Sequence, residues 1–284
     1  MNHIDIAHAI QINVAAALAE DIGSGDLTAL LIPAERSGRA TLISREDAVL
    51  CGIPWFEACF KALDPQINIT WLAKEGEHID ANATLCEING NARAILSAER
   101  PALNFLQMLS ATATVTRRYV DAVAGTKTLI MDTRKTLPGL RVAQKYAVKI
   151  GGGTNQRMGL FDGILIKENH IAAAGSIAAA LRAAQQAAPA GVSIQIEVES
   201  LAELQEALDA GAKLILLDNF NIDQMRAAVH LTAKRAALEA SGGISFDAVR
   251  AIAGTGVDRI SIGGLTKHVR SVDLSLRIQA KREV

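Results

Sequence analysis

The sequence DTRKTLPGLR (residues 132–141), followed by GGGTNQR (151–157) and ILIKENH (164–170), decides the fold and chemistry expected of this chain. From Arg134 to Lys167 there are seven lysines and arginines and one acid, although the whole chain has a formal net charge of only -1. A local excess of positive charge beside a glycine run indicates a site for a small polyanion. The simpler alternative, a solvated basic helix face, is expected for Lys145 and Lys149, which are four residues apart.

From residue 128 onward, short apolar runs typical of strands alternate with alanine-rich helical stretches. The last four runs begin at residues 193, 214, 236 and 259, a spacing of 21 to 23 residues. One strand and one helix per step predict right-handed parallel crossovers. No dinucleotide fingerprint follows the first strand, so we expect an incomplete parallel α/β barrel rather than a doubly wound sheet. The six predicted strands are 128–131, 163–166, 193–198, 214–217, 236–239 and 259–262.

The residues before 128 show grouped strands and helices, which is an α+β pattern. Asp26, at the end of GSGD (23–26), is expected to cap the next segment. A long helix is predicted over 92–122, with a break considered near Pro101. A final strand over 272–278 is expected to return to this first part of the chain. The other predicted elements are helices 6–20 and 55–63 and strands 39–44, 67–72 and 84–88.

Composition places the chain among ordinary globular proteins, because half of its 284 residues are hydrophobic and 21% are charged. No apolar run approaches the roughly 18 residues of a membrane span. The start of the sequence, residues 1–6, shows no secretory signal. Three cysteines without CxxC spacing indicate buried thiols in a reducing compartment, so we expect a cytoplasmic protein. The balanced charge argues against nucleic acid as a partner.

The ends of the predicted strands carry polar residues, and in a parallel barrel these ends meet at one mouth. Glu197 and Asp218 would suit ribose hydroxyls or a phosphate-bound Mg²⁺. The loops at 241–243 and 263–264 are predicted to cradle a phosphate, with plain turns as the alternative. Strand alternation places Gln195, Glu197 and Glu199 on one face, where Glu197 could instead pair with a lysine.

Other chemical patterns are absent from the sequence. No Ser-His-Asp set, zinc-binding HExxH helix or Walker loop is found. His170 is interpreted as a hydrogen-bonded structural residue rather than a base. Arg100 is interpreted, from the residues alone, as a partner of Glu99 or of a helix terminus.

The residues resemble those of the quinolinate phosphoribosyltransferase family, also called nicotinate-nucleotide pyrophosphorylase (carboxylating), over nearly the full length. The most specific match joins TRKT and Pro-Gly at 133–139 to the triple glycine at 151–153. Further matches are EDIGSGDLT (20–28), ERPALN (99–104), EVE (197–199) and LDNF (217–220). The resemblance implies an N-terminal α/β sandwich domain over 1–111, to which 266–284 returns, and a catalytic α/β barrel over 112–265.

The resemblance also implies an activity and a set of site residues. The activity joins quinolinate to phosphoribosyl pyrophosphate (PRPP), giving nicotinate mononucleotide, pyrophosphate and CO₂ in NAD biosynthesis. It needs Mg²⁺, held directly or indirectly by Glu197 and Asp218, and a homodimer in which Arg100 enters the partner's site. Lys135, Lys167, Glu197 and Asp218 match the catalytic positions. The substrate-binding positions are Arg100, Thr133, Arg134, Lys135, Gln156, Arg157, Lys167, Glu197, Asp218, Ser241, Gly242, Gly243, Ile262, Gly263 and Gly264.

One position departs from the family pattern, which usually reads Asn-His-Arg where this chain has Asn155-Gln156-Arg157. The family's histidine is expected to help hold a substrate carboxylate, and glutamine cannot become cationic. Gly264 also stands where alanine is common. Two alternatives remain open: a nicotinate-type phosphoribosyltransferase without decarboxylation, and a non-catalytic anion-binding paralogue.

Overall fold

The computed structural model describes residues 5–279, which divide into two compact units. The antiparallel unit comprises 5–117, Leu137–Gly152 and 268–279, and the parallel unit comprises Arg118–Thr136 and Gly153–Lys267. Most of the 1–6 stretch read for a secretory signal lies outside the described residues, as do the last five residues of the predicted 266–284 return. The domain boundaries at 111 and 265 stay predictions. Within 5–279 no helix combines the length and apolar character that a membrane crossing requires.

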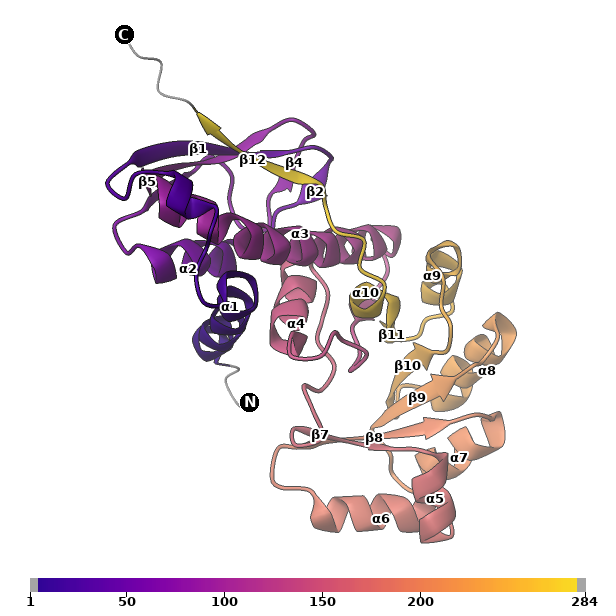
Figure 1. The fold of residues 1–284 in the computed structure, drawn as a ribbon. Helices are drawn as coiled ribbons and strands as arrows, with labels where there is room; N and C mark the ends of the chain where they lie inside the picture. Colours follow the sequence, from indigo (N-terminus) through magenta and orange to yellow (C-terminus); the bar gives the residue numbers. More distant parts are fainter. Residues whose placement is uncertain (1–4, 280–284) are drawn as a thin grey trace. The chain divides into compact units, whose positions relative to one another are not determined.

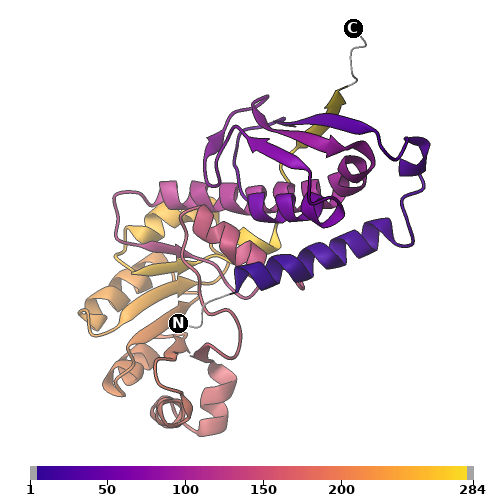
Figure 2. The same ribbon diagram turned by 90° about the vertical axis from the view of Figure 1, so that its left-hand side faces the viewer.

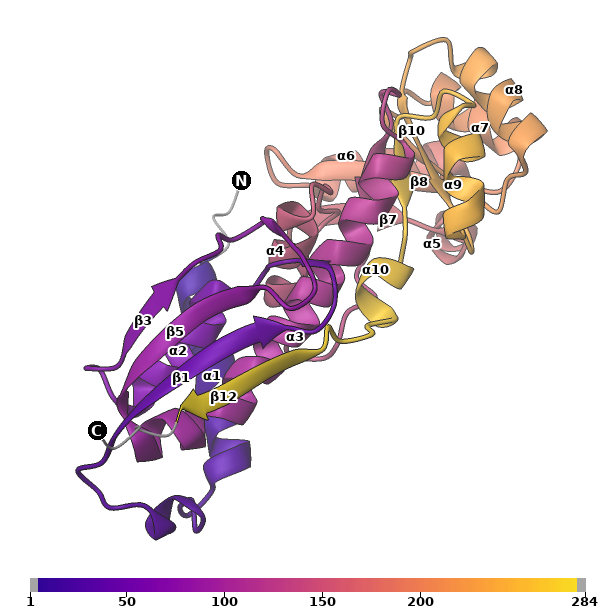
Figure 3. The ribbon, with the colours of Figure 1, turned by 90° about the horizontal axis from the view of Figure 1, so that it is seen from above.

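The antiparallel unit is built on a four-stranded sheet in the order β12-β1-β5-β3 (Figure 3). Its strands are β1 (Ser37–Ser44), β3 (Asn68–Trp71), β5 (Thr84–Asn91) and β12 (Leu274–Gln279). The predicted C-terminal strand is confirmed, because β12 pairs antiparallel with β1. A short pair, β2 (Ala48–Val49) with β4 (His78–Ile79), and the 3₁₀ turn η1 (Ala29–Leu31) complete its non-helical elements.

Helices of this unit gather on one side of that sheet (Figure 2). They are α1 (Ile6–Ile22), α2 (Ile53–Leu63), α3 (Ala92–Ala122) and α4 (Arg141–Ile150). Trp55, Phe56 and Phe60 of α2 are fully buried and pack in one core with residues of β1, β5 and α3. Each such side chain contributes roughly 1.5–3 kcal/mol by leaving water.

The helix predicted over 92–122 and the Asp26 cap are confirmed, whereas the solvated position expected of Lys145 is wrong. Helix α3 continues through Pro101, because this proline is part of a long buried stripe whose packing outweighs the lost hydrogen bond. Lys145 is only 1% exposed, since its face of α4 packs into the unit, and only Lys149 lies on the solvated side. Asp26 does cap η1, where its Oδ1 accepts from the backbone N–H groups of Thr28 and Ala29.

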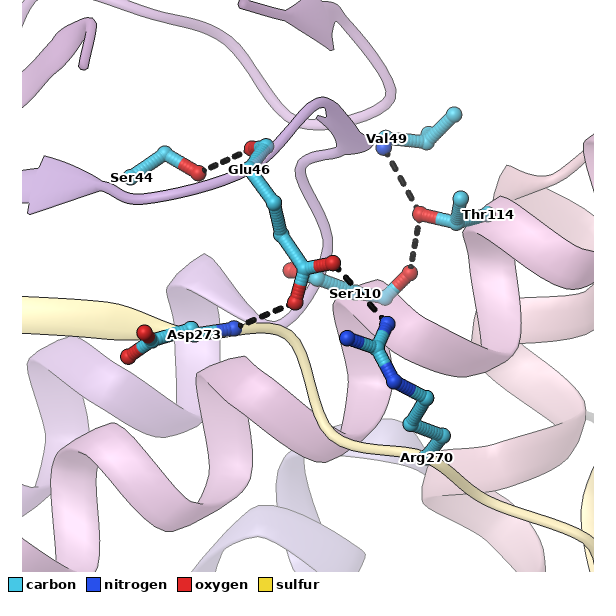
Figure 4. A network of polar contacts seen from close by, with 7 residues as sticks. All are labelled: Ser44, Glu46, Val49, Ser110, Thr114, Arg270 and Asp273. Carbon is cyan, nitrogen blue, oxygen red and sulfur yellow. Dashed lines mark hydrogen bonds and ion pairs between the residues drawn. The ribbon is translucent and has the colours of Figure 1, made fainter. Parts of the chain in front are cut away.

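A polar network ties the chain segment before β12 to the rest of the antiparallel unit (Figure 4). The Glu46 carboxylate accepts from Arg270 Nη1 at 2.9 Å and from the backbone N–H of Asp273 at 2.8 Å. Arg270 is the main reason that the pKa of Glu46 lies below its usual value. Beside it, Thr114 Oγ1 of α3 accepts from Val49 N–H, so α3 is bonded to β2.

The parallel unit contains a six-stranded, all-parallel sheet in the order β6-β11-β10-β9-β8-β7. The end strands β6 and β7 are not paired with each other among the described residues; a single parallel bridge joins Met131 to Thr154. The expected incomplete α/β barrel is thereby confirmed. The strands are β6 (Leu129–Met131), β7 (Gly163–Ile166), β8 (Ser193–Val198), β9 (Leu214–Asp218), β10 (Ala237–Ser241) and β11 (Arg259–Ser261).

Helices follow the strands of this sheet and lie around its outer side (Figure 1). Alternating apolar residues such as Ile196, Val198 and Leu217 are buried on the helix-covered face. The opposite face carries Gln195, Glu197 and Glu239, which are also buried. The helices are α5 (Glu168–Ala174), α6 (Ile177–Ala187), α7 (Leu201–Asp209), α8 (Ile222–Thr232), α9 (Phe246–Ala253) and α10 (Gly264–Lys267).

Candidate active site

The carboxyl ends of the six parallel strands lie at one edge of the sheet, as parallel pairing requires. The residues that follow these strands are therefore gathered from distant parts of the sequence. Every predicted site residue except Arg100 belongs to the parallel unit.

Lys167 and Glu197 form an ion pair between the ends of β7 and β8. Lys167 Nζ donates to Glu197 Oε2 at 2.7 Å. The Glu197 side chain is 9% exposed and that of Lys167 is 47% exposed, so the carboxylate lies deep and the ammonium faces the opening. The alternative considered from the sequence, in which Glu197 pairs with a lysine, is therefore confirmed, and the lysine is Lys167. A ligand anion arriving at Lys167 would share this cation with Glu197.

Arg134 and Arg157 lie close enough for their charges to interact. Burial lowers the pKa of Arg157, the nearby charge of Arg134 lowers it further, and Asp162 opposes both. Arg157 Nη1 donates to the backbone carbonyl of Gly163 at 2.8 Å, which holds the guanidinium against the start of β7. Two like charges gathered in a half-buried place favour a ligand with more than one negative charge.

Buried carboxylates anchor the loop that carries Gln156. Asp132 accepts from Asn155 Nδ2 at 2.7 Å and from the Gln156 backbone N–H at 2.8 Å. The Gln156 side chain donates through Nε2 to Glu239 Oε1 at 2.6 Å. Gln195 Nε2 donates to the other oxygen of Glu239 at 3.0 Å.

Glu239 was not among the residues predicted for the site. Its carboxyl is 0% exposed, and burial raises its pKa despite the hydrogen bonds it accepts. The available signal was an acid inside a predicted apolar strand, which is costly unless it is partnered.

Asp218 is held by its neighbour Asn219. Asn219 has a left-handed backbone (φ 57°), and its Nδ2 donates to Asp218 Oδ2 at 2.8 Å. A Cβ atom at Gly242 would lie 2.2 Å from Asn219 Oδ1, so the loop after β10 requires glycine there. The loop at 241–243 therefore packs directly on the residue that orients Asp218.

Several carboxylates lie near one another around Glu199, at the ends of β7, β8 and β9. The pKa of Glu199 is raised chiefly by Glu168, with smaller contributions from Glu203 and Asp218. Within residues 5–279 no group of three or more His, Cys, Asp or Glu side chains is arranged to hold a metal ion.

The loops after β6 and β11 also meet. The Lys135 backbone N–H donates to Thr133 Oγ1 at 3.0 Å, and Thr266 Oγ1 donates to the Lys135 carbonyl at 2.8 Å. A Cβ atom at Gly263 would lie 3.0 Å from Lys135 Cδ, so the lysine stem runs over this glycine. Ile262 and Gly264 flank that contact, and Gly264 begins α10.

Two further residues singled out in the sequence are Arg100, which belongs to the other unit, and His170. Arg100 is exposed on α3 in the antiparallel unit, and its expected role in a partner's site stays a prediction. His170 Nδ1 accepts from the Lys167 backbone N–H at 3.0 Å, so its interpretation as a structural residue is confirmed.

Comparison with known proteins matches both parts of the chain. Residues 26–110 match the family model "Quinolinate phosphoribosyl transferase, N-terminal domain" and residues 112–277 match "Quinolinate phosphoribosyl transferase, C-terminal domain". A "Probable nicotinate-nucleotide pyrophosphorylase [carboxylating]" of Bacillus subtilis is 43% identical over 93% of this chain and 91% of its own length. The corresponding Mycobacterium leprae protein is 42% identical, covering 92% and 94%. A solved nicotinate-nucleotide pyrophosphorylase structure from Francisella tularensis superposes with a TM-score of 0.92 at 46% identity, covering 96% of each chain.

Proposed function

The chain belongs to the quinolinate phosphoribosyltransferase family, and we infer that it converts quinolinate and PRPP into nicotinate mononucleotide, pyrophosphate and CO₂. It is a pentosyltransferase of NAD biosynthesis. The ring nitrogen of quinolinate forms a bond to the anomeric carbon of the ribose as pyrophosphate leaves. The resulting pyridinium accepts the electron pair released as CO₂ departs, and the ring carbon then takes up a proton.

The interacting guanidinium groups of Arg134 and Arg157 carry this proposal, because quinolinate is a dianion. An opposite charge at about 4 Å contributes on the order of 4 kcal/mol at an effective dielectric near 20. Arginine also offers a planar fork of donors that can fix the plane of a carboxylate. We place quinolinate at these two residues and Gln156.

The sugar donor is assigned to the residues at the other strand ends. Lys135 and Lys167 would neutralise the pyrophosphate as it leaves, and Thr133 would hydrogen-bond to it. Glu197 and Asp218 would bind the ribose hydroxyls. The 5′-phosphate would lie on the backbone N–H groups of the loops 241–243 and 262–264, which include Ser241, Gly242, Gly243, Ile262, Gly263 and Gly264.

Mg²⁺ fits the two carboxylates Glu197 and Asp218, because this ion is typically bound by one or two carboxylates together with substrate phosphates. The absence of a three-ligand cluster within residues 5–279 agrees with an ion that arrives on PRPP. When bound, it would supply positive charge to the leaving pyrophosphate.

Homodimerisation is proposed from the family resemblance, with Arg100 contributing to the site of the partner. Leu27, Leu30 and Leu31 are 80%, 65% and 82% exposed, which supports a covered surface on the antiparallel unit. The cytoplasmic location expected from the sequence also stays a proposal. Size-exclusion chromatography with light scattering tests the dimer, and mixing Arg100→Ala with Lys167→Met chains should restore activity if the sites are shared.

The activity is tested by measuring nicotinate mononucleotide and ¹⁴CO₂ from carboxyl-labelled quinolinate, with and without Mg²⁺. Equal release of both products supports the assignment. Product from nicotinate without CO₂ would favour the non-decarboxylating alternative, and binding of quinolinate without turnover would favour the non-catalytic paralogue. Arg134→Ala should abolish useful turnover, since an unpaired substrate carboxylate would cost roughly 3–5 kcal/mol. Wild-type kinetic constants in that variant would refute its role.

A further inference from the structure

A buried carboxyl lies beneath the candidate quinolinate site and has no place in the mechanism above. Glu239 of β10 is 0% exposed, and both of its oxygens accept hydrogen bonds from neutral amides. One donor is Gln156 Nε2 at 2.6 Å, and the other is Gln195 Nε2 of β8 at 3.0 Å. Three separate chain segments thus converge on this side chain.

The register of the sheet shows that an acid is not needed here for packing. Leu216 of β9 is paired with Glu197 on one side and with Glu239 on the other, so all three lie at one level of the same face. Leu216 is buried at this level, so an apolar side chain can be accommodated on this face. A buried acid costs folding free energy that an apolar residue of similar size would not, so its presence needs another explanation.

The partners of the two acids at this level differ in charge. Glu197 is paired with the cation Lys167, whereas the side chains that donate to Glu239 are neutral. Arg259 is paired in register with Glu239 on the neighbouring β11 and opposes the rise in its pKa, as does Ser261. Glu239 therefore serves as a hydrogen-bond acceptor more than as one half of an ion pair.

The hydrogen bond from Gln156 Nε2 to Glu239 Oε1 fixes the orientation of the Gln156 amide. Its nitrogen faces Glu239, and its carbonyl oxygen is directed away from that carboxyl. The backbone of Gln156 is held independently by Asp132 at 2.8 Å. With backbone and amide both held, this side chain has one defined orientation beside Arg157.

We propose that Glu239 is a positioning residue for quinolinate binding, acting through the amide of Gln156. The proposal rests on the function inferred above and extends it by naming what orients Gln156. Gln195 serves the same purpose one step further away, by holding the second oxygen of Glu239.

The test compares Glu239→Met, which removes the acceptor at similar volume, with Glu239→Gln, which keeps an oxygen acceptor for Gln156. Glu239→Met should raise the KM for quinolinate about tenfold and leave the KM for PRPP within about twofold, the loss expected for one hydrogen bond. Glu239→Gln should restore the quinolinate KM to within about threefold. Circular dichroism and thermal melting are recorded for each variant, and concentrations refer to folded protein.

A double-mutant cycle with Gln156→Leu completes the experiment. If Glu239 acts through Gln156, the combined variant should lose no more than Gln156→Leu alone. The proposal would be overturned if the losses of the two single variants multiply in the combined variant. It would also be overturned if Glu239→Met raises the KM for quinolinate and the KM for PRPP equally. Neither result would contradict the proposed function of the chain. A wild-type chain that does not turn over quinolinate would instead overturn the proposed function, and this inference with it.

Discussion

Replacing Gly242 with alanine should damage the site more than the same change one residue later. Gly242 has φ 104°, and an added Cβ atom would lie 2.2 Å from Asn219 Oδ1 and 2.9 Å from the Asn219 backbone nitrogen. Backbone strain at such a residue costs about 1–3 kcal/mol. Moving the Asn219 amide away would also break its hydrogen bond to Asp218, which contributes about 0.5–1.5 kcal/mol. Together these effects predict a loss of about 1.5–4.5 kcal/mol.

Gly243 provides the matched control, because it has φ 55° but no atom within 4 Å of an added Cβ. Gly243→Ala should therefore cost only the left-handed backbone penalty of about 1–2 kcal/mol. In calorimetric melting of the full chain, Tm should fall by about 5 °C for Gly242→Ala and about 2–3 °C for Gly243→Ala. The KM for PRPP should rise more in Gly242→Ala, because Asp218 loses its orientation.

The double variant Gly242→Ala/Asn219→Gly separates strain from collision. It removes the side-chain atoms that the new Cβ would meet, so part of the lost Tm should return while the KM for PRPP stays high. The reasoning is refuted if Gly242→Ala and Gly243→Ala melt alike, or if the double variant is less stable than Gly242→Ala.

Three further predictions concern other parts of the molecule. Gln156→His should bind quinolinate about three- to tenfold more tightly by calorimetry at pH 6, because an imidazolium can pair with a substrate carboxylate and glutamine cannot become cationic. The gain should vanish as pH rises and the imidazole becomes neutral, and a pH-independent affinity would contradict it. No thiol of the folded protein should react quickly with Ellman's reagent at pH 8, because Cys51, Cys59 and Cys86 are buried. Burial also raises the pKa of Cys59 to about 12, so little of this thiol is in the reactive thiolate form. Rapid labelling of the native chain would count against this. Ala233→Gly should raise Tm by about 1–2 °C, because Ala233 has a left-handed backbone (φ 47°) that glycine adopts without strain. The control Ala227→Gly, at an exposed position inside α8, should lower Tm instead.

The parallel sheet could be predicted because its signal is local and repeated. Each βα step places a short apolar run at nearly constant spacing, and the strand ends then determine which residues share an edge. The cationic residues were proposed for the site for the same reason, since Lys167 directly follows β7 and Arg134 and Lys135 lie in the loop after β6.

Burial that depends on distant packing could not be predicted in this way. Lys145 and Lys149 have the spacing of a solvated face, yet packing in the antiparallel unit buries Lys145. Pro101 has the local signal of a helix break, yet α3 continues because its buried stripe is long. Glu239 is an acid within a predicted apolar strand, which indicates a buried partner but does not identify it; only the register of β8, β9 and β10 brings it to Gln195.

Glu197 and Glu239 lie at one level of the sheet face, and their different partners indicate how a ligand can displace one interaction while the other is kept. The Lys167–Glu197 pair is charged and half open, so an incoming polyanion can compete for the ammonium at modest cost. The side chains that donate to Glu239 are neutral, and the carboxyl itself is buried, so a phosphate or carboxylate has no cation to take from these bonds. We therefore expect exchange to be confined to the Lys167–Glu197 pair, while Glu239 keeps Gln156 oriented when substrate binds.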